Sequence, residues 1–357
     1  MCQEEHNEEL NRRQFVKRAG MLGAGAFTVL AGSRAMAQTT STMPTLTAPP
    51  KGLKPISKRK FGKSDDEVSI IGVGGHHIGQ VEEPLGIRIV HEAIDHGINF
   101  MDNAWDYHDG KSEEVMGKAL KSDGRRDKVF LMTKVCTHGR DANVAMKQLE
   151  DSLRRLQTDR IDLWQIHEVA YENDPENHFA KGGVTEALLK AKEQGKVRYI
   201  GFTGHKDPRL HKRMLSHDFP FDAVQMPLNP FDASFRSFEQ EILPILREKG
   251  MAVIGMKSLG GAADMVKNGA VTAQEALSYA MSLPVTTTVS GMPSLAVLYQ
   301  NLAIASGFEP WPEEKRKELA QRVAPMAADG RFEMYKVSAR FEGKEGRIQH
   351  GFPLGGG

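Results

Sequence analysis

Four side chains that can move a proton or hold a charge lie at or just beyond the ends of short apolar runs: Asp102, Tyr107, Lys134 and His167. An ammonium beside a phenol stabilises the phenolate, so we expect Lys134 to lower the pKa of Tyr107 toward neutrality. Asp102 is expected to hold Lys134 charged, and His167 to orient a substrate oxygen. Together these groups are suited to proton transfer to a carbonyl oxygen without a metal ion. The alternative is a structural role, in which Asp102 and Lys134 form a salt bridge and Tyr107 and His167 are packing residues.

The elements that position these groups follow from hydrophobic periodicity. Between Val68 and Ser306, short apolar runs alternate with segments whose apolar residues recur every three or four positions, which predicts strands followed by helices. The expected strands are 68–73, 98–102, 129–135, 161–166, 199–203, 223–226, 252–256 and 286–290. The expected helices are 90–96, 112–120, 144–156, 185–194, 208–215, 238–248, 273–282 and 295–305.

Eight such units over about 240 residues predict an α/β fold of the (β/α)8 TIM barrel type, for which about 250 residues is typical. An open, doubly wound sheet is the alternative, but the glycines at 72, 74 and 75 match its dinucleotide-binding turn only weakly. We expect an N-terminal β-hairpin from Ile56–Phe61 and the start of the first strand, and a C-terminal helical extension at Glu313–Val323. A barrel places chemistry at the C-terminal ends of its strands, where the four groups lie.

These motifs, in this order, resemble the aldo-keto reductase superfamily. Residues 99–120 resemble the family signature that carries the aspartate and tyrosine, and residues 130–134 and 162–167 resemble its lysine and histidine strands. The resemblance runs from about Ile56 to Ala305. It implies reduction of an aldehyde or ketone by hydride from NADP(H) or NAD(H), with Tyr107 as proton donor and a catalytic tetrad of Asp102, Tyr107, Lys134 and His167.

The same resemblance implies a set of cofactor contacts. Gln225 falls on the family's glutamine for the nicotinamide carboxamide, Thr203 replaces a serine, and Met256 replaces a stacking aromatic residue. Where many members place Lys, Ser and Arg around the 2′-phosphate, this chain lacks charged donors, so we expect NADH to be accepted as well as NADPH. The expected contacts are Gly74, Gly75, Thr203, Gln225, Met256, Lys257, Leu259, Gly260, Gly291, Met292, Gln300 and Asn301.

The first 37 residues differ from the rest of the chain. Arg12 and Arg13 precede an apolar stretch at 19–31, which is shorter than the roughly 20 residues that span a bilayer, and the stretch leads to a small-residue exit at Ala37. The pattern resembles a twin-arginine export signal. It implies the twin-arginine export machinery as a partner, cleavage after Ala37, a periplasmic location and no stable membrane anchor.

The remaining boundaries follow from composition. Thr, Ser and Pro dominate residues 38–55, which predicts a flexible linker, and a loose tail is expected over 344–357. The barrel is expected to occupy 56–343.

Charge and cysteine content exclude several classes of function. Lys+Arg total 47 against Asp+Glu 46, a formal net charge of +1, which gives no reason to expect a nucleic-acid partner. The two cysteines, Cys2 and Cys136, are too few for a disulfide framework or a multi-cysteine metal site. Histidines near strand ends are expected to line a polar pocket rather than bind a metal ion; they are His76, His77, His108, His138 and His205.

Three interpretations of the function stay open. The chain is an NAD(P)H-dependent carbonyl reductase, an exported cofactor-binding redox sensor or subunit with little turnover, or an enzyme that retains its dinucleotide throughout the cycle. The sequence does not identify the substrate. Loops at 169–182, 229–237 and beyond Phe308 are expected to form the pocket walls, with Phe231, Phe235 and Trp311 as candidate apolar contacts.

Overall fold

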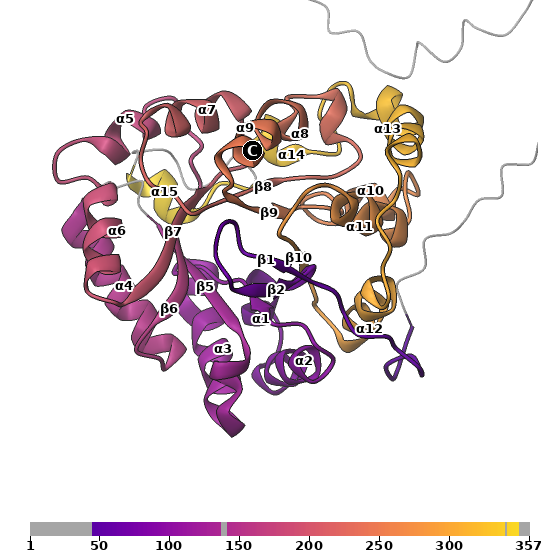
Figure 1. The fold of residues 1–357 in the computed structure, drawn as a ribbon, viewed down its shortest axis with the longest axis horizontal. Helices are drawn as coiled ribbons and strands as arrows, with labels where there is room; N and C mark the ends of the chain where they lie inside the picture. The colour runs from indigo at the N-terminus through magenta and orange to yellow at the C-terminus, as the bar shows by residue number, and fades with distance from the viewer. Residues whose placement is uncertain (1–44, 137–140, 340, 350–357) are drawn as a thin grey trace, which may run out of the picture. The chain divides into compact units, whose positions relative to one another are not determined.

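Eight parallel strands close into a barrel in the computed structural model, which describes residues 45–136, 141–339 and 341–349 (Figure 1). Neighbouring strands follow chain order, and the last strand pairs with the first. The strands are β3 (Ile71–Gly74), β4 (Phe100–Met101), β5 (Phe130–Val135), β6 (Ile161–Ile166), β7 (Val197–Thr203), β8 (Ala223–Pro227), β9 (Ala252–Met256) and β10 (Thr287–Gly291). The predicted TIM barrel is confirmed.

Alternate residues of each strand face the barrel interior, because successive side chains in a strand point to opposite faces. Met132 and Leu163 belong to the buried cluster inside the barrel, whereas Leu131 and Trp164 pack in the larger cluster that includes the helices. The same alternation points Lys134, two residues after Met132, to the inside of the barrel at its C-terminal end.

The predicted N-terminal hairpin closes the opposite end of the barrel. Strands β1 (Lys58–Lys60) and β2 (Glu67–Ser69) pair in antiparallel fashion, and buried Phe61 contacts Phe130, with 4.6 Å between the ring centroids. The strand expected over 68–73 divides into β2 and β3. The division lies where the Ser69 hydroxyl donates a hydrogen bond to the Ile71 carbonyl (2.7 Å).

Helices surround the barrel. Those that follow its strands are α2 (Glu83–Asp95), α3 (Lys111–Lys121), α4 (Ala142–Leu156), α6 (Val184–Glu193), α7 (Pro208–Ser216), α9 (Leu243–Lys249), α11 (Ala273–Ser282) and α12 (Leu295–Ala305). Additional short elements are α1 (Gly75–Gln80), α5 (Asp174–Phe179), α8 (Phe238–Glu241), α10 (Asp264–Lys267), and the 3-10 turns η1 (Tyr107–Gly110), η2 (Ser122–Lys128) and η3 (Asp232–Ser234). The helix expected over 238–248 is split into α8 and α9, because Pro244 lacks a backbone N–H and begins a new helical turn.

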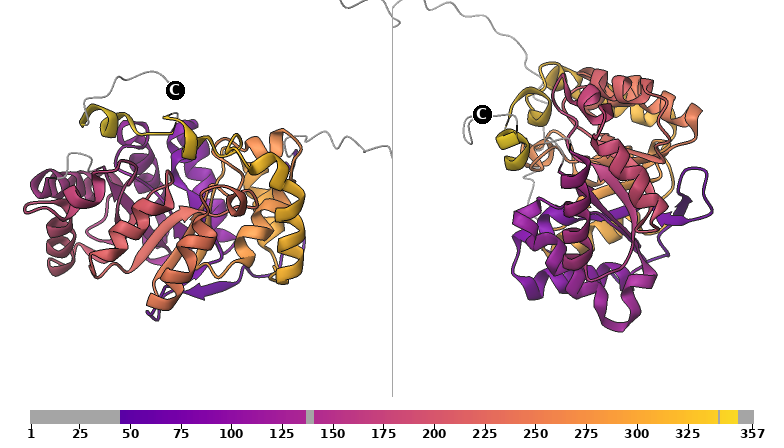
Figure 2. Two further views of the ribbon diagram at one scale, coloured as in Figure 1. Left: turned by 90° about the horizontal axis from the view of Figure 1, so that it is seen from above. Right: turned by 90° about the vertical axis from the view of Figure 1, so that its left-hand side faces the viewer.

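The chain continues through the predicted extension, α13 (Glu313–Ala327), into a C-terminal segment formed by residues 332–339 and 341–349. This segment holds α14 (Met334–Val337) and α15 (Lys344–Gln349), so residues 344–349 are helical rather than loose; residues 350–357 lie outside the described part. Figure 2 shows the yellow C-terminal helices and the indigo hairpin at opposite ends of the barrel.

A buried ion cluster fastens the C-terminal segment. The Lys336 Nζ lies 2.7 Å from Asp232 Oδ1 and 3.0 Å from Glu333 Oε1, and all three side chains are buried. An ammonium taken out of water needs such partners, because burial of an unpaired charge is costly. The cluster therefore fixes the C-terminal segment to the loop after β8.

The expected export signal at 1–37 and part of the linker lie outside the described residues. Residues 45–55 form turns and bends before the hairpin. Within the part of the chain that the structure describes, no helix is both long enough and apolar enough to cross a membrane.

Candidate active site

A buried ammonium organises the mouth of the barrel. Lys134 Nζ donates to Asp102 Oδ2 (2.8 Å), to the carbonyl oxygen of Asn103 (2.7 Å) and to the Tyr107 hydroxyl oxygen (3.4 Å). The side chains of Lys134 and Asp102 are only 1% and 4% exposed. An ammonium has three N–H groups, so these contacts use its full donor capacity.

Tyr107 lies at the start of η1, beside this ammonium, with its ring centroid 4.9 Å from Lys134 Nζ. Burial raises the pKa of Tyr107 well above its ordinary value, and the carboxylates of Asp102, Asp106 and Glu168 raise it further. The expected lowering of the Tyr107 pKa is wrong for this state of the protein, because burial and these three carboxylates outweigh the nearby ammonium. The phenol therefore keeps its proton at neutral pH.

His167 follows β6, and its backbone N–H donates to the carbonyl of Val135 (3.0 Å), which continues the pairing of β5 with β6. Its ring lies at 76° to the Tyr107 ring, with 5.5 Å between centroids. The structure thus brings together all four expected side chains of the tetrad. Their spacing and burial suit transfer of a proton from Tyr107 to an oxygen bound at the mouth.

Gln225, on β8, extends the cluster toward the expected nicotinamide position. Its Nε2 donates to Asp102 Oδ2 (3.0 Å), while its buried Oε1 has no hydrogen-bond partner. A carboxamide N–H₂ would satisfy this acceptor, so the residue fits a bound nicotinamide. Thr203 Oγ1, at the end of β7, contacts Met256 Sδ, at the end of β9, at 4.0 Å, so these two expected residues lie side by side.

The loop after β9 has donors that suit a phosphate. Lys257 is half-buried, and burial lowers its pKa to about 8 while Glu168 opposes this shift. The Ser258 hydroxyl is buried without a hydrogen-bond partner. A cation and a free hydroxyl on one loop fit the pyrophosphate of a dinucleotide. Leu259 packs against the core, and Gly260 has a φ of +80° that a side chain would strain.

Three expected glycine contacts have packing roles. A Cβ on Gly75 would lie 2.2 Å from the Asp102 carbonyl oxygen, and one on Gly291 would lie 2.2 Å from the His77 ring. Gly74, which is paired with Gly291 between β3 and β10, is nearly as crowded, because its Cβ would lie 3.1 Å from the Ser290 carbonyl oxygen. The absence of a side chain at these positions lets the backbones of β3, β10 and the segment directly after β4 approach one another closely at the mouth.

The expected adenosine contacts differ from one another. On α12, Gln300 is half-buried, and Asn301 donates from Nδ2 to Ser290 Oγ (3.1 Å) while its Oδ1 has no partner. That free acceptor suits an adenine amino group. The side chain of Met292 is fully buried in the hydrophobic core, directly after the end of β10.

Histidines flank the tyrosine. The His76 ring lies 5.2 Å from the Tyr107 ring and 4.6 Å from the His108 ring, centroid to centroid. Burial, together with the neighbouring His77, lowers the pKa of His76 to about 4, so His76 is neutral at physiological pH. Among the described residues, no three His, Cys, Asp or Glu side chains are arranged to hold a metal ion; His138 lies outside them.

Comparison with known proteins agrees with this geometry. Residues 70–268 match the aldo/keto reductase family. The chain belongs to that family. Aldo-keto reductase YhdN of Bacillus subtilis is 32% identical over 196 residues, which cover 52% of this chain and 56% of the relative. The NADP(+) aldo-keto reductase yakc of Schizosaccharomyces pombe is 30% identical over 219 residues, which cover 57% of this chain and 62% of the relative.

The fold of this aldo/keto reductase is similar to solved structures over nearly their full length. The holo form of aldo-keto reductase AKR11C1 from Bacillus halodurans is 27% identical, with a TM-score of 0.63 over 75% of this chain and 96% of that chain. The chain matches less than two thirds of the length of the curated relatives.

Sequence patterns missed two carboxylates at the mouth of this aldo/keto reductase. Asp106 Oδ1 lies 3.0 Å from His167 Nδ1. Glu168 has a left-handed φ of +52°, accepts the Gly343 backbone N–H (2.7 Å), and lies 3.5 Å from His205 Nε2. Each carboxylate is next to a tetrad residue in the sequence, but only the loop conformation shows what it contacts.

The walls of the mouth also differ from expectation. Trp311 donates its backbone N–H to Ser282 at the end of α11, near the N-terminal end of β10, so it lies far from the active site. Phe231 is fully buried in the core. Instead, the C-terminal segment places the rings of Tyr335 and Phe341 5.3 Å and 5.1 Å from Lys257 Nζ.

The raised pKa of Tyr107 predicts that this phenol stays protonated through the ordinary range of tyrosine ionisation. Tyrosinate absorbance followed from pH 7 to about pH 10 should rise equally in the wild type and in Tyr107→Phe. A wild-type curve with one additional tyrosinate near neutral pH would show instead that Lys134 lowers the pKa.

Proposed function

We propose that this aldo/keto reductase reduces an aldehyde or ketone to an alcohol with a reduced nicotinamide dinucleotide. The observation that carries the proposal is the buried Lys134 ammonium, which contacts both Asp102 and the hydroxyl of Tyr107. A protein that only binds a dinucleotide has no need of an acid beside a buried cation.

Tyr107 acts as the general acid in this proposal. When bound, the reduced dinucleotide supplies a hydride to the carbonyl carbon. Tyr107 donates its hydroxyl proton to the carbonyl oxygen, so the product is an alcohol and the side chain becomes a phenolate. Lys134 lies 3.4 Å from that oxygen and stabilises the phenolate, while Asp102 keeps the ammonium in place. Water then reprotonates the phenolate.

His167 orients the carbonyl oxygen. It lies edge to face with Tyr107, so an oxygen between the two side chains meets a phenol on one side and an imidazole on the other. A positioned pair of donors stabilises the charge that develops on this oxygen as the hydride arrives.

Tyr107→Phe removes the acid and keeps the ring. We expect kcat for carbonyl reduction to fall by at least about 100-fold, while the dissociation constant of the dinucleotide is unchanged. Tyr199→Phe is the matched control, because Tyr199 bonds to Asp66 at the opposite end of the barrel. Wild-type turnover by Tyr107→Phe would refute the assignment of the proton donor, and a wild type inactive on a broad carbonyl panel would refute the reductase.

Both NADP(H) and NAD(H) are proposed as cofactors. The relative yakc is named for NADP(+), and the free acceptors of Gln225 and Asn301 suit the parts that the two dinucleotides share. Helix α12 has no basic residue in its first or last turn, and Gly291 and Met292 supply no charge for a 2′-phosphate. A dianionic phosphate favours charged donors.

Titration of the purified protein with each reduced dinucleotide tests this preference. We expect NADH to bind as tightly as NADPH, or more tightly. NADPH binding that is tighter by about tenfold, equivalent to about 1.4 kcal/mol, would contradict the proposal.

We also propose that the chain is exported to the periplasm through the twin-arginine machinery, with loss of residues 1–37. Support comes from Arg12 and Arg13 ahead of the apolar stretch. N-terminal sequencing of the protein from a periplasmic extract should begin at Gln38. Full-length chain confined to the cytoplasm would exclude export.

A further inference from the structure

A carboxylate that the tetrad does not include is bonded to its histidine. Asp106 Oδ1 lies 3.0 Å from His167 Nδ1, and each of the two side chains is only 10% exposed. Asp106 comes directly before Tyr107 in the chain, so one loop presents both the acid and a partner for the histidine. The contact joins the loop after β4 to the end of β6 across the mouth.

The chemistry of the pair fixes the protonation of the ring. An ionised carboxylate only accepts hydrogen bonds, so His167 must carry a proton on Nδ1 and donate it to Asp106. The other nitrogen, Nε2, is then left for an oxygen at the mouth. A carboxylate with this geometry selects one tautomer and one orientation of an imidazole, which are the properties that a substrate-orienting histidine needs.

The residue directly before Asp106 is held by two hydrogen bonds. Trp105 donates its N–H to the Lys134 carbonyl (3.0 Å), and its own carbonyl accepts from Arg155 Nη1 (2.9 Å). Arg155 also pairs with the fully buried carboxylate of Glu113 (3.3 Å). The loop is therefore anchored to β5 and α4, which gives the Asp106 carboxylate a fixed place against the histidine.

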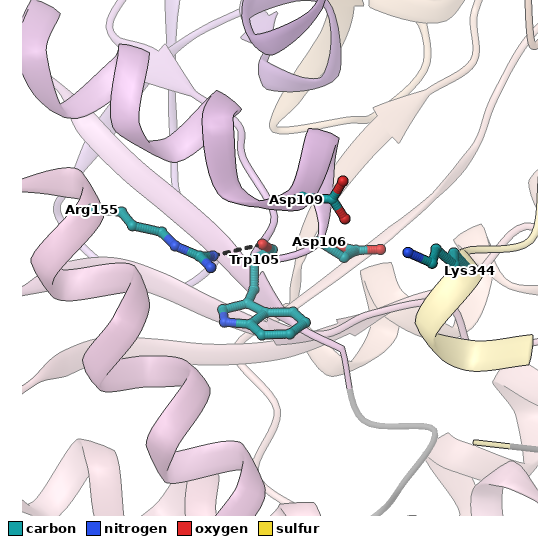
Figure 3. A pocket seen from close by; sticks show the side chains of 5 residues that line it. All are labelled: Trp105, Asp106, Asp109, Arg155 and Lys344. Carbon is teal, nitrogen blue, oxygen red and sulfur yellow. Dashed lines mark hydrogen bonds between the residues drawn. The ribbon is translucent and has the colours of Figure 1, made fainter. Parts of the chain in front are cut away.

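Asp106 also lines a small cavity. The cavity has a volume of about 140 Å³, and its walls are Trp105, Asp106, Asp109, Arg155 and Lys344 (Figure 3). This volume admits water or a small anion to the neighbourhood of the carboxylate. Asp109 shares the cavity but is exposed and makes no bond to His167 among the interactions of the described residues, so it offers a matched control.

We propose that Asp106 is a positioning residue that holds His167 in its Nδ1-protonated form and turns Nε2 toward the substrate oxygen. The inference rests on the proposed carbonyl reduction, in which His167 orients that oxygen. Asp106 itself touches neither substrate nor dinucleotide in this scheme.

Steady-state kinetics of Asp106→Ala, Asp106→Asn and Asp109→Ala test the proposal. We expect Asp106→Ala to lower kcat by about 10-fold to 100-fold with unchanged dinucleotide affinity. Asp106→Asn should fall between Asp106→Ala and the wild type, because its uncharged amide oxygen still accepts a hydrogen bond from the Nδ1–H of His167. Asp109→Ala should match the wild type. Equal kcat values for Asp106→Ala and Asp109→Ala would overturn the proposal.

Chemical rescue separates positioning from a general structural role. Formate added to Asp106→Ala can enter the enlarged cavity and accept a hydrogen bond from the Nδ1–H of His167, so kcat should rise saturably with formate and should not rise with chloride. Formate should leave Asp109→Ala unaffected. A low kcat in Asp106→Ala that formate does not raise would indicate loss of structure rather than loss of the carboxylate.

Nitrogen NMR of ¹⁵N-histidine-labelled protein tests the same claim without turnover, with His167→Gln used to assign the signals. The wild type should show His167 protonated on Nδ1, and Asp106→Ala should shift the proton toward Nε2. The same tautomer in both proteins would overturn the proposal. This readout needs no substrate, so it tests the role of Asp106 even if the proposed function fails. A wild type that reduces no carbonyl compound would refute the proposed function, whereas the tautomer of His167 decides the role of Asp106.

Discussion

The rest of the site depends on the burial of one ammonium. Lys134 lies inside the barrel because it continues the inward alternation of β5, and its side chain is 1% exposed. Breaking a buried ion pair by removing one partner typically costs about 3–5 kcal/mol. The buried ammonium therefore needs hydrogen-bond acceptors around it. Asp102, the carbonyl of Asn103 and the hydroxyl of Tyr107 provide them. Because the buried ammonium needs hydrogen-bond acceptors, the end of β4 and the start of η1 lie against Lys134. The same arrangement places the phenol of Tyr107 beside the ammonium.

Two other features keep this cluster in place. The N-terminal hairpin closes one end of the barrel with Phe61, and the C-terminal segment is fastened at the other end by the buried Lys336 cluster. At the mouth, Glu168 and Lys257 both adopt left-handed backbone angles within two residues of the end of a strand. Such strain in residues other than glycine persists only where the surrounding contacts enforce it, and it is common at functional sites.

The strands could be predicted from the sequence because they follow from local periodicity, and the tetrad could be predicted because its motifs resemble those of a known family. Alternation within a strand decides which residues face inward, and the barrel decides that strand ends converge, so Lys134, His167 and Gln225 could be placed without a structure. The pKa of Tyr107 could not, because its direction depends on burial in the folded mouth and on which carboxylates the loops bring near the phenol, among them Glu168, which is distant in sequence. The same holds for Asp106, whose role depends on a loop turned toward β6. The expectation that Trp311 lines the pocket is wrong because the chain beyond α12 can return to either end of the barrel, and the sequence does not show which.

The central claim is that the groups around Lys134 serve transfer of a hydride and a proton to a carbonyl group. Mass spectrometry of the alcohol formed from a carbonyl substrate and a reduced dinucleotide deuterated at the transferring carbon of the nicotinamide tests it most directly. The account predicts one deuterium on the carbinol carbon of every product molecule, and product formation that is lost in Tyr107→Phe. Alcohol without deuterium, or no alcohol from any aldehyde or ketone tested with either dinucleotide, would contradict it.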